Sequence, residues 1–129
     1  MNPAPRVLVV DDERHVRAML GDLLTLWGCR PVAAASGREA VERFAEGRWD
    51  LVLTDLIMPG MSGLDLAEQV RGRDDAVELI MLTASSMDLD AHARRLGFTV
   101  VRKPLPLAEL EAAVREALAR RRARVARTA

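Results

Sequence analysis

The stretch LVLTDLIMPG, residues 51–60, places an acid directly after a buried strand. Residues 51–54 suit a strand that is covered on both sides, and Pro59 with Gly60 turns the chain. Asp55 stands between them, at the point where burial ends. Because Pro59 and Gly60 already supply the turn, Asp55 is not needed as a turn former, and its position indicates a functional carboxylate.

Further strands and helices alternate along the chain on both sides of this stretch. Strands are predicted at residues 7–10, 31–35, 51–54, 77–82 and 98–102. Helical patterns follow them up to Gly28, from Ser36 to near Gly47, from Ser62 to around Gly72, over residues 87–96 and from Leu107 onward. Short apolar strands that alternate with amphipathic helices favour a parallel sheet covered on both faces. The predicted class is therefore a doubly wound α/β fold with five strands and five helices.

Length and composition limit what else the chain can be. It has 129 residues, half of them apolar, which is enough for one domain with a core and too little for two. No apolar run reaches 18 residues and the short one at residues 7–10 does not fit a signal peptide, so we expect a soluble, cytoplasmic protein without membrane partners. The single Cys29 permits neither an internal disulfide nor a cysteine metal cage.

Charge is spread unevenly although the formal net charge is zero. The last ten residues carry Arg120, Arg121, Arg122, Arg124 and Arg127 and no acid. We therefore divide the chain into a domain at residues 1–122 and a basic tail at residues 123–129, expected to be a solvated end or a linker. Contact with nucleic acid or an acidic partner is the other interpretation, but the tail lacks interleaved aromatic residues, so direct nucleic-acid binding is not expected.

Chemically active side chains follow four of the predicted strands. Asp11 and Asp12 come after the first, Asp55 after the third, Thr83 after the fourth and Lys103 after the fifth. Lys103 is the one lysine among 19 basic residues, which indicates a position that needs a compact ammonium group. Since ligands bind beyond the carboxyl ends of strands in open parallel sheets, these side chains should meet at one edge.

Three carboxylates at one edge repel one another and call for protons or a cation. Oxygen ligands without His or Cys favour a hard ion, and few carboxylates with room for water suggest Mg²⁺. Beside such an ion, Asp55 is placed to attack a phosphoryl group and form an aspartyl phosphate. Lys103 would hold the phosphoryl oxygens and Thr83 would donate a hydrogen bond to them.

Four quoted segments carry a family resemblance that covers nearly the whole chain: VLVVDDE (7–13), LTDLIMPGMSGLDL (53–66), IMLTA (80–84) and VVRKPL (100–105). In order and spacing they resemble the motifs of response-regulator receiver domains of two-component signalling. The resemblance implies a flavodoxin-like sheet with strand order 2-1-3-4-5 and a phosphorylation-dependent switch that is not an ordinary enzyme. It also implies a sensor histidine kinase or phosphotransfer protein as donor, and a downstream protein or a covalently linked output domain as receiver of the signal.

The same resemblance assigns roles to individual residues. Asp55 is implied as the phosphoacceptor, with Thr83 and Lys103 beside it. Asp11, Asp12, Asp55 and the backbone carbonyl of Ile57 are implied as Mg²⁺ ligands. The resemblance also implies a cis peptide bond before Pro104. It implies that the signal passes through the surface of the fourth helix, fifth strand and fifth helix. The protein is expected to be a monomer or a weak homodimer.

Two positions depart from the family pattern. Receivers usually carry Phe or Tyr three residues before the lysine, where this chain has Val100, and Phe98 on the same strand face is a candidate replacement. Ile57, two residues after the acceptor, has no polar atom with which to orient a hydrolytic water. A long-lived phosphoryl group is expected for that reason.

Three other functions are compatible with parts of this sequence. Asp11 and Asp12 could merely cap a helix, although Asp55, Thr83 and Lys103 then stay unexplained. An aspartyl phosphohydrolase of the haloacid-dehalogenase type carries a second acid two residues after the nucleophile, where this chain has Ile57. Neither phosphate-binding glycine motif of nucleotide-binding proteins occurs. A receiver-like protein interaction module that works without phosphorylation is the alternative that stays open.

Overall fold

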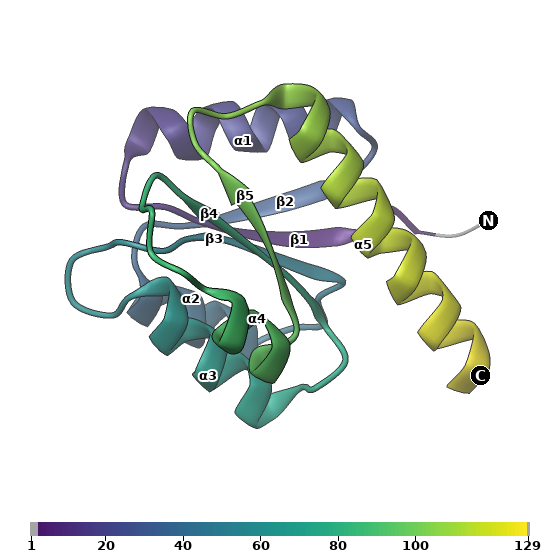
Figure 1. Ribbon diagram of the computed structural model, residues 1–129. Coiled ribbons are helices and arrows are strands. Elements are labelled where there is room, and N and C mark those ends of the chain that lie inside the picture. The colour runs from purple at the N-terminus through teal and green to yellow at the C-terminus, as the bar shows by residue number, and fades with distance from the viewer. Residues whose placement is uncertain (1–2, 129) are drawn as a thin grey trace.

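Five parallel strands form one sheet in the order β2-β1-β3-β4-β5 (Figure 1). The computed structural model describes residues 3–128. The strands are β1 (Arg6–Val10), β2 (Arg30–Ala34), β3 (Leu51–Asp55), β4 (Glu78–Thr83) and β5 (Phe98–Arg102). The helices are α1 (Arg14–Leu26), α2 (Gly37–Ala45), α3 (Gly63–Arg73), α4 (Asp90–Leu96) and α5 (Leu107–Thr128). The predicted doubly wound fold and strand order are confirmed.

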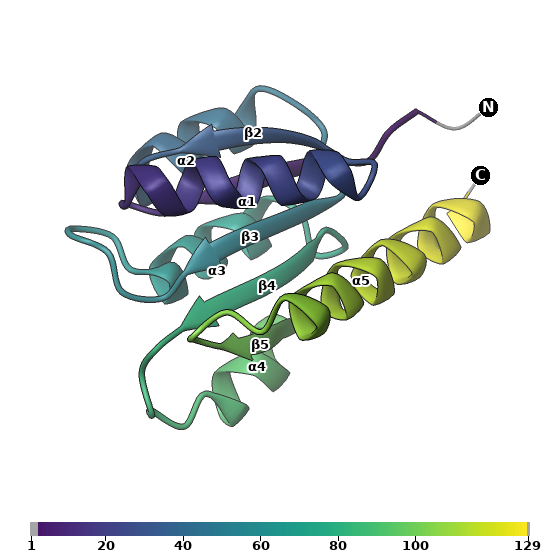
Figure 2. The same ribbon diagram turned by 90° about the horizontal axis from the view of Figure 1, so that it is seen from above.

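Helices cover both faces of the sheet, so its central strands are buried on two sides. Helices α1 and α5 lie on one face, and α2, α3 and α4 lie on the other (Figures 1 and 2). Successive strand residues point to opposite faces, so Val7 and Val9 pack with the α1 and α5 side while Leu8 and Val10 pack with the other. This two-sided burial explains why β1, β3 and β4 read as unbroken apolar runs instead of alternating patterns.

Two of the predicted functional residues belong to strands instead of following them. Asp55 is the last residue of β3 and pairs with Leu82, and Thr83 is the last residue of β4 and pairs with Arg102. Each therefore continues the backbone ladder while its side chain reaches the end of the core. The strand backbone fixes where both side chains begin.

Serine caps start two helices as the sequence predicts. The Ser36 hydroxyl accepts a hydrogen bond from the Glu39 N–H at the start of α2. At α3, Ser62 and Asp65 form a complete capping box, each side chain accepting from the other residue's backbone N–H. Because a cap satisfies N–H groups that have no partner inside the helix, these two starts were readable from sequence.

Helix α4 is shorter than predicted. A helix was expected over residues 87–96, but α4 begins at Asp90. The backbone N–H groups of Met87 and Asp90 donate instead to the side chains of Ser85 and Asp88. Such local bonds compete with the helical pattern and leave residues 84–89 as a loop.

The predicted boundary at residue 122 between the domain and a basic tail does not coincide with an end of helix α5. Helix α5 continues through residue 122 without a break. Arg120 and Arg124 hold the carboxylate of Glu78, with N–O distances of 3.0 and 2.7 Å. Arg121 lies 3.4 Å from Asp50, which also accepts from the Arg6 N–H. Helix α5 is therefore fastened to the amino-terminal ends of β3 and β4.

Within residues 3–128, none of the helices combines the length and the apolar character that a membrane crossing requires. The longest, α5, carries several arginines along its second half.

Removal of the two arginines that hold Glu78 should destabilise the domain. The Arg120→Ala/Arg124→Ala variant leaves a carboxylate that is only 4% exposed without its charged partners. Because both guanidinium groups are themselves partly in solvent, we expect a loss of about 1 to 2 kcal/mol in the free energy of unfolding. Urea unfolding measures it. The control, Arg122→Ala/Arg127→Ala, makes the same change at two exposed arginines of α5 and should differ little from wild type; equal losses in both variants would contradict the prediction.

Candidate functional site

The predicted site residues meet at the carboxyl edge of the sheet. Strands β1 and β3 are neighbours, and the strand order reverses between them. Asp11 and Asp12 follow β1, Asp55 ends β3, and Lys103 follows β5. Their convergence follows from topology, because parallel strands all end at the same edge.

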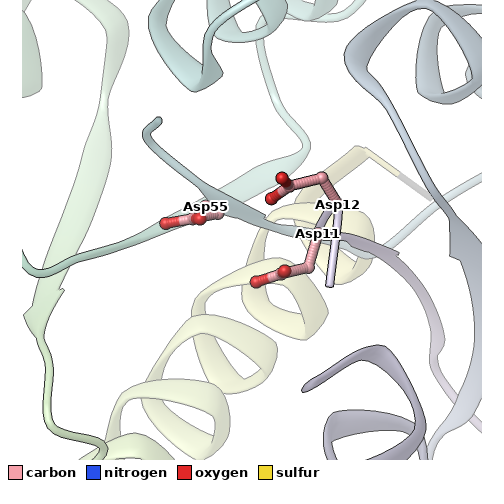
Figure 3. Close-up of side chains that lie close together, drawn as sticks. All are labelled: Asp11, Asp12 and Asp55. Atoms are coloured by element: carbon pink, nitrogen blue, oxygen red, sulfur yellow. The ribbon is translucent and has the colours of Figure 1, made fainter. Parts of the chain in front are cut away.

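Three carboxylates gather there. Asp11, Asp12 and Asp55 each offer an oxygen atom, and these atoms lie within 4.8 Å of one another. Figure 3 shows the three side chains grouped with their carboxyl oxygens pointing the same way. Asp11 is buried, Asp55 is partly buried and Asp12 is exposed, so the group spans the boundary between core and solvent.

The negative charge of Asp11 is only partly stabilised by its surroundings. Its Oδ1 accepts from the Glu13 N–H at 2.8 Å, but its buried Oδ2 has no hydrogen-bond partner among the described residues. Burial raises the pKa of the Asp11 carboxyl, and the nearby charge of Asp55 raises it further, while the Glu13 N–H and Lys103 act in the opposite direction. The folded protein therefore holds this side chain in a place where its negative charge is disfavoured.

Lys103 brings the positive charge. Its Nζ lies 3.4 Å from Asp55 Oδ1 and 3.8 Å from Asp11 Oδ2. The Lys103 N–H donates to the Thr83 carbonyl, and the Lys103–Pro104 peptide bond is cis, as the resemblance implied. The backbone of β5 and the turn that follows it thus carry the ammonium to the acids.

Thr83 is buried at the end of β4, where it pairs with Arg102, the residue before Lys103. Its hydroxyl oxygen accepts a hydrogen bond from the Ser85 N–H at 2.9 Å. Val100 is partly buried against the core, and Phe98 is a buried member of that core. The aromatic ring of Phe98 therefore lies inside the domain in this structure.

The donor set fits a divalent cation. Three carboxylates against one ammonium leave excess negative charge, and the buried Asp11 Oδ2 lacks a partner that a metal would supply. Oxygen donors of this kind suit Mg²⁺, which takes one or two carboxylates and keeps several waters. Ile57, whose carbonyl is expected to complete the set, follows Asp55 by two residues and is 68% exposed.

The sequence reading missed three residues that shape the site. Gly63 packs so closely that a Cβ there would lie 2.3 Å from the carbonyl oxygen of Asp55, so only glycine fits. The Arg17 guanidinium donates to the carbonyl of Asp11 at 2.8 Å. Arg102 donates to the backbone of the loop after Thr83. Spacing in sequence gave no signal for the two arginines, because both act on backbone carbonyls that tertiary packing brings within reach.

Comparisons with known proteins agree with this geometry. The model of the response regulator receiver domain family matches residues 7–115. Sporulation initiation phosphotransferase F of Bacillus subtilis is 30% identical over 115 residues, which cover 88% of this chain and 93% of that protein. The regulatory protein AtoC of Escherichia coli is 37% identical over 120 residues, 92% of this chain, but the chain spans only 26% of the length of AtoC.

Solved structures show the same fold. The response regulator TrrA from Thermotoga maritima, solved in complex with Mg²⁺-BeF, has a TM-score of 0.81 and 36% identity, covering 88% of this chain and 99% of that one. The chemotaxis protein CheY4 of Vibrio cholerae has a TM-score of 0.82 and 28% identity, covering 89% of this chain and 99% of that one.

The raised pKa of Asp11 predicts how stability depends on pH in metal-free protein. Between the ordinary pKa of 3.8 and the raised value, the folded state binds more protons than the unfolded state, so the free energy of unfolding falls as pH rises through that window. The Asp11→Asn variant has no such charge. In EDTA its stability relative to wild type should therefore increase from pH 4 to pH 7, as measured by urea unfolding at each pH.

Asp12→Asn is the matched control, because it removes the same charge from an exposed side chain. It should show a smaller change of relative stability over this pH range. A variant Asp11→Asn that is less stable than wild type at pH 7 would mean that attraction to Lys103 outweighs burial, contrary to the prediction.

Proposed function

This chain belongs to the family of response regulator receiver domains, and from that premise we propose that it is a phosphorylation-dependent signalling switch in which Asp55 accepts a phosphoryl group. The donor is a sensor histidine kinase or a phosphotransfer protein, and the reaction depends on Mg²⁺. Receiver domains act as switches, not as typical enzymes, and this chain takes part in its own phosphorylation in the same sense.

One observation carries the proposal. Asp55 belongs to a cluster of carboxylates that suits a cation, and the Nζ atom of the single lysine of the chain lies 3.4 Å from its Oδ1. Its side chain is 13% exposed, so it is held in place and still open to a donor.

Phosphoryl transfer at this site forms one bond and breaks one. A carboxylate oxygen of Asp55 attacks phosphorus as the bond from phosphorus to the donor's histidine nitrogen breaks, and the electron pair leaves on that nitrogen. Asp11, Asp12, Asp55 and the Ile57 carbonyl would hold Mg²⁺. When bound, the ion supplies positive charge that offsets the carboxylates and the phosphoryl oxygens.

Lys103 and Thr83 serve the transferred group. The Lys103 ammonium already lies near Asp55 and can bind a phosphoryl oxygen, where the charge of the transition state is spread. The Thr83 hydroxyl, which accepts a bond from Ser85, still has its own hydrogen to donate. Its turn toward Asp55 would mark the phosphorylated state.

The output is a change of surface. A phosphoryl group adds about −1.5 to −2 charges at Asp55. Movement of Thr83 and Lys103 toward it would shift the loops that follow β4 and β5, and with them the surface formed by α4, β5 and α5. A downstream protein or a covalently linked output domain would read that surface.

Intact mass measures the central step directly. We expect wild-type protein incubated with Mg²⁺ and acetyl phosphate to gain the mass of one phosphoryl group. The Asp55→Asn variant should gain none, because an amide cannot act as the nucleophile, and EDTA should prevent the gain in wild type. Asp65→Asn is a matched control, since it changes an acid of the α3 cap and should leave the gain intact. No gain in wild type would favour the module that works without phosphorylation.

Ile57 predicts a slow loss of the phosphoryl group. Ile57 lies two residues after Asp55 and is 68% exposed, and its apolar side chain cannot hydrogen-bond a water for hydrolysis. After removal of the donor, mass spectra over time should show phosphoprotein that persists for minutes or longer. The Ile57→Asn variant, whose amide can hydrogen-bond a water, should lose the group faster. Loss from wild type within seconds would refute this expectation.

A further inference from the structure

The loop between β4 and α4, residues 84–89, makes few packing contacts with the core. It contains no helix or strand, and only Leu89 of its six residues is buried. Ala84, Ser86, Met87 and Asp88 are exposed. The loop follows Thr83 directly, so whatever fixes the loop also acts on the position of the Thr83 side chain.

Arg102 fixes the loop from the neighbouring strand. Its guanidinium donates through Nη1 to the Ser85 carbonyl and through Nη2 to the Met87 carbonyl, the second at 3.2 Å. Hydrogen bonds from a charged donor are stronger than neutral ones. Arg102 is also the β5 residue that pairs with Thr83 in the sheet, and it immediately precedes Lys103. One side chain thus ties the loop to the end of β5, where the lysine of the site begins.

Ser85 is held from two sides. Its N–H donates to the Thr83 hydroxyl oxygen at 2.9 Å, while its carbonyl accepts from Arg102. Its hydroxyl also accepts from the Met87 N–H at 3.0 Å, which closes the loop on itself. Thr83, Ser85 and Arg102 are therefore linked by hydrogen bonds. If the loop moves with Thr83 toward Asp55, the hydrogen bonds between Arg102 and the loop must break or shift.

Other side chains of β5 do not offer this link in the described part of the chain. Val100 has no polar atom in its side chain and packs against the core, and Phe98 is buried within it. Arg102, by contrast, is exposed and reaches across the loop surface. The polar connection from β5 to the loop is thus made by an arginine, on a strand that lacks an aromatic residue at position 100.

We propose that Arg102 is a positioning residue that holds residues 84–89, and through Ser85 the Thr83 hydroxyl, in the arrangement of the unphosphorylated protein. This inference rests on the proposed function and deepens it. Because Arg102 favours the resting arrangement, its removal makes the phosphorylation-competent arrangement easier to reach. Loss of Arg102 therefore speeds phosphorylation of Asp55, an effect that damage to the fold alone would not produce.

The test compares wild type with Arg102→Ala, Arg102→Lys and the control Arg94→Ala. Arg94 is an exposed arginine of α4 whose side chain makes no ion pair or hydrogen bond within residues 3–128. Two quantities are measured on the intact chain. One is amide hydrogen exchange at Ser85 and Met87 without phosphodonor. The other is the rate of mass gain with acetyl phosphate at saturating Mg²⁺.

Faster exchange at both amides is expected in Arg102→Ala, together with a phosphorylation rate about fivefold above wild type, the effect of losing about one exposed charge-assisted hydrogen bond. Arg102→Lys should lie between, because an ammonium keeps the charge but loses the planar fork that reaches two carbonyls. Arg94→Ala should match wild type in both measurements.

Two results would overturn the inference. Unchanged exchange in Arg102→Ala would show that Arg102 does not hold the loop, and faster exchange with an equal or lower phosphorylation rate would show that the loop does not restrain Thr83. If wild type gains no phosphoryl group, the proposed function fails, and the exchange comparison still decides whether Arg102 holds the loop.

Discussion

Mutual repulsion among Asp11, Asp12 and Asp55 is the constraint on which the rest of this structure depends. Their carboxylate oxygens lie within 4.8 Å of one another at the end of the sheet. Lys103 offsets part of this charge, but the buried Oδ2 of Asp11 keeps no hydrogen-bond partner among the described residues. The fold holds these acids together at an energetic disadvantage, and the excess negative charge at this edge favours a divalent cation.

The two edges of the sheet treat their acids differently. At the amino-terminal edge, Glu78 and Asp50 face three arginines of α5, so their charge is neutralised by permanent partners. At the carboxyl edge, three acids share one lysine. The first arrangement fastens helix α5 to the sheet and leaves no excess charge for a cation. The arrangement at the carboxyl edge leaves excess negative charge, which a site for a cation requires.

The carboxyl edge of the sheet is supported by the closely packed core. Strands β1, β3 and β4 are covered on both faces, and Gly63 lets the start of α3 approach the backbone of Asp55 closely. In contrast, the loop after Thr83 is mostly exposed and is held by a few polar contacts, those of Arg102 among them. Asp55 is thus fixed while the loop beside it is held more weakly, an arrangement that suits a switch with two states.

The sequence by itself determined the fold class, the strand order implied by the family resemblance and the residues that gather at the carboxyl edge. These follow from local patterns: apolar runs for buried strands, serine caps for α2 and α3, and the rule that parallel strands end together. Only the tertiary structure decided the later start of α4, the fastening of the arginines of α5 to Glu78 and Asp50, and the reach of Arg102 to Ser85 and Met87. Each of these depends on partners 15 to 71 residues away in the chain or on bonds that compete with a helical pattern, and neither spacing nor composition records which distant groups come within bonding distance.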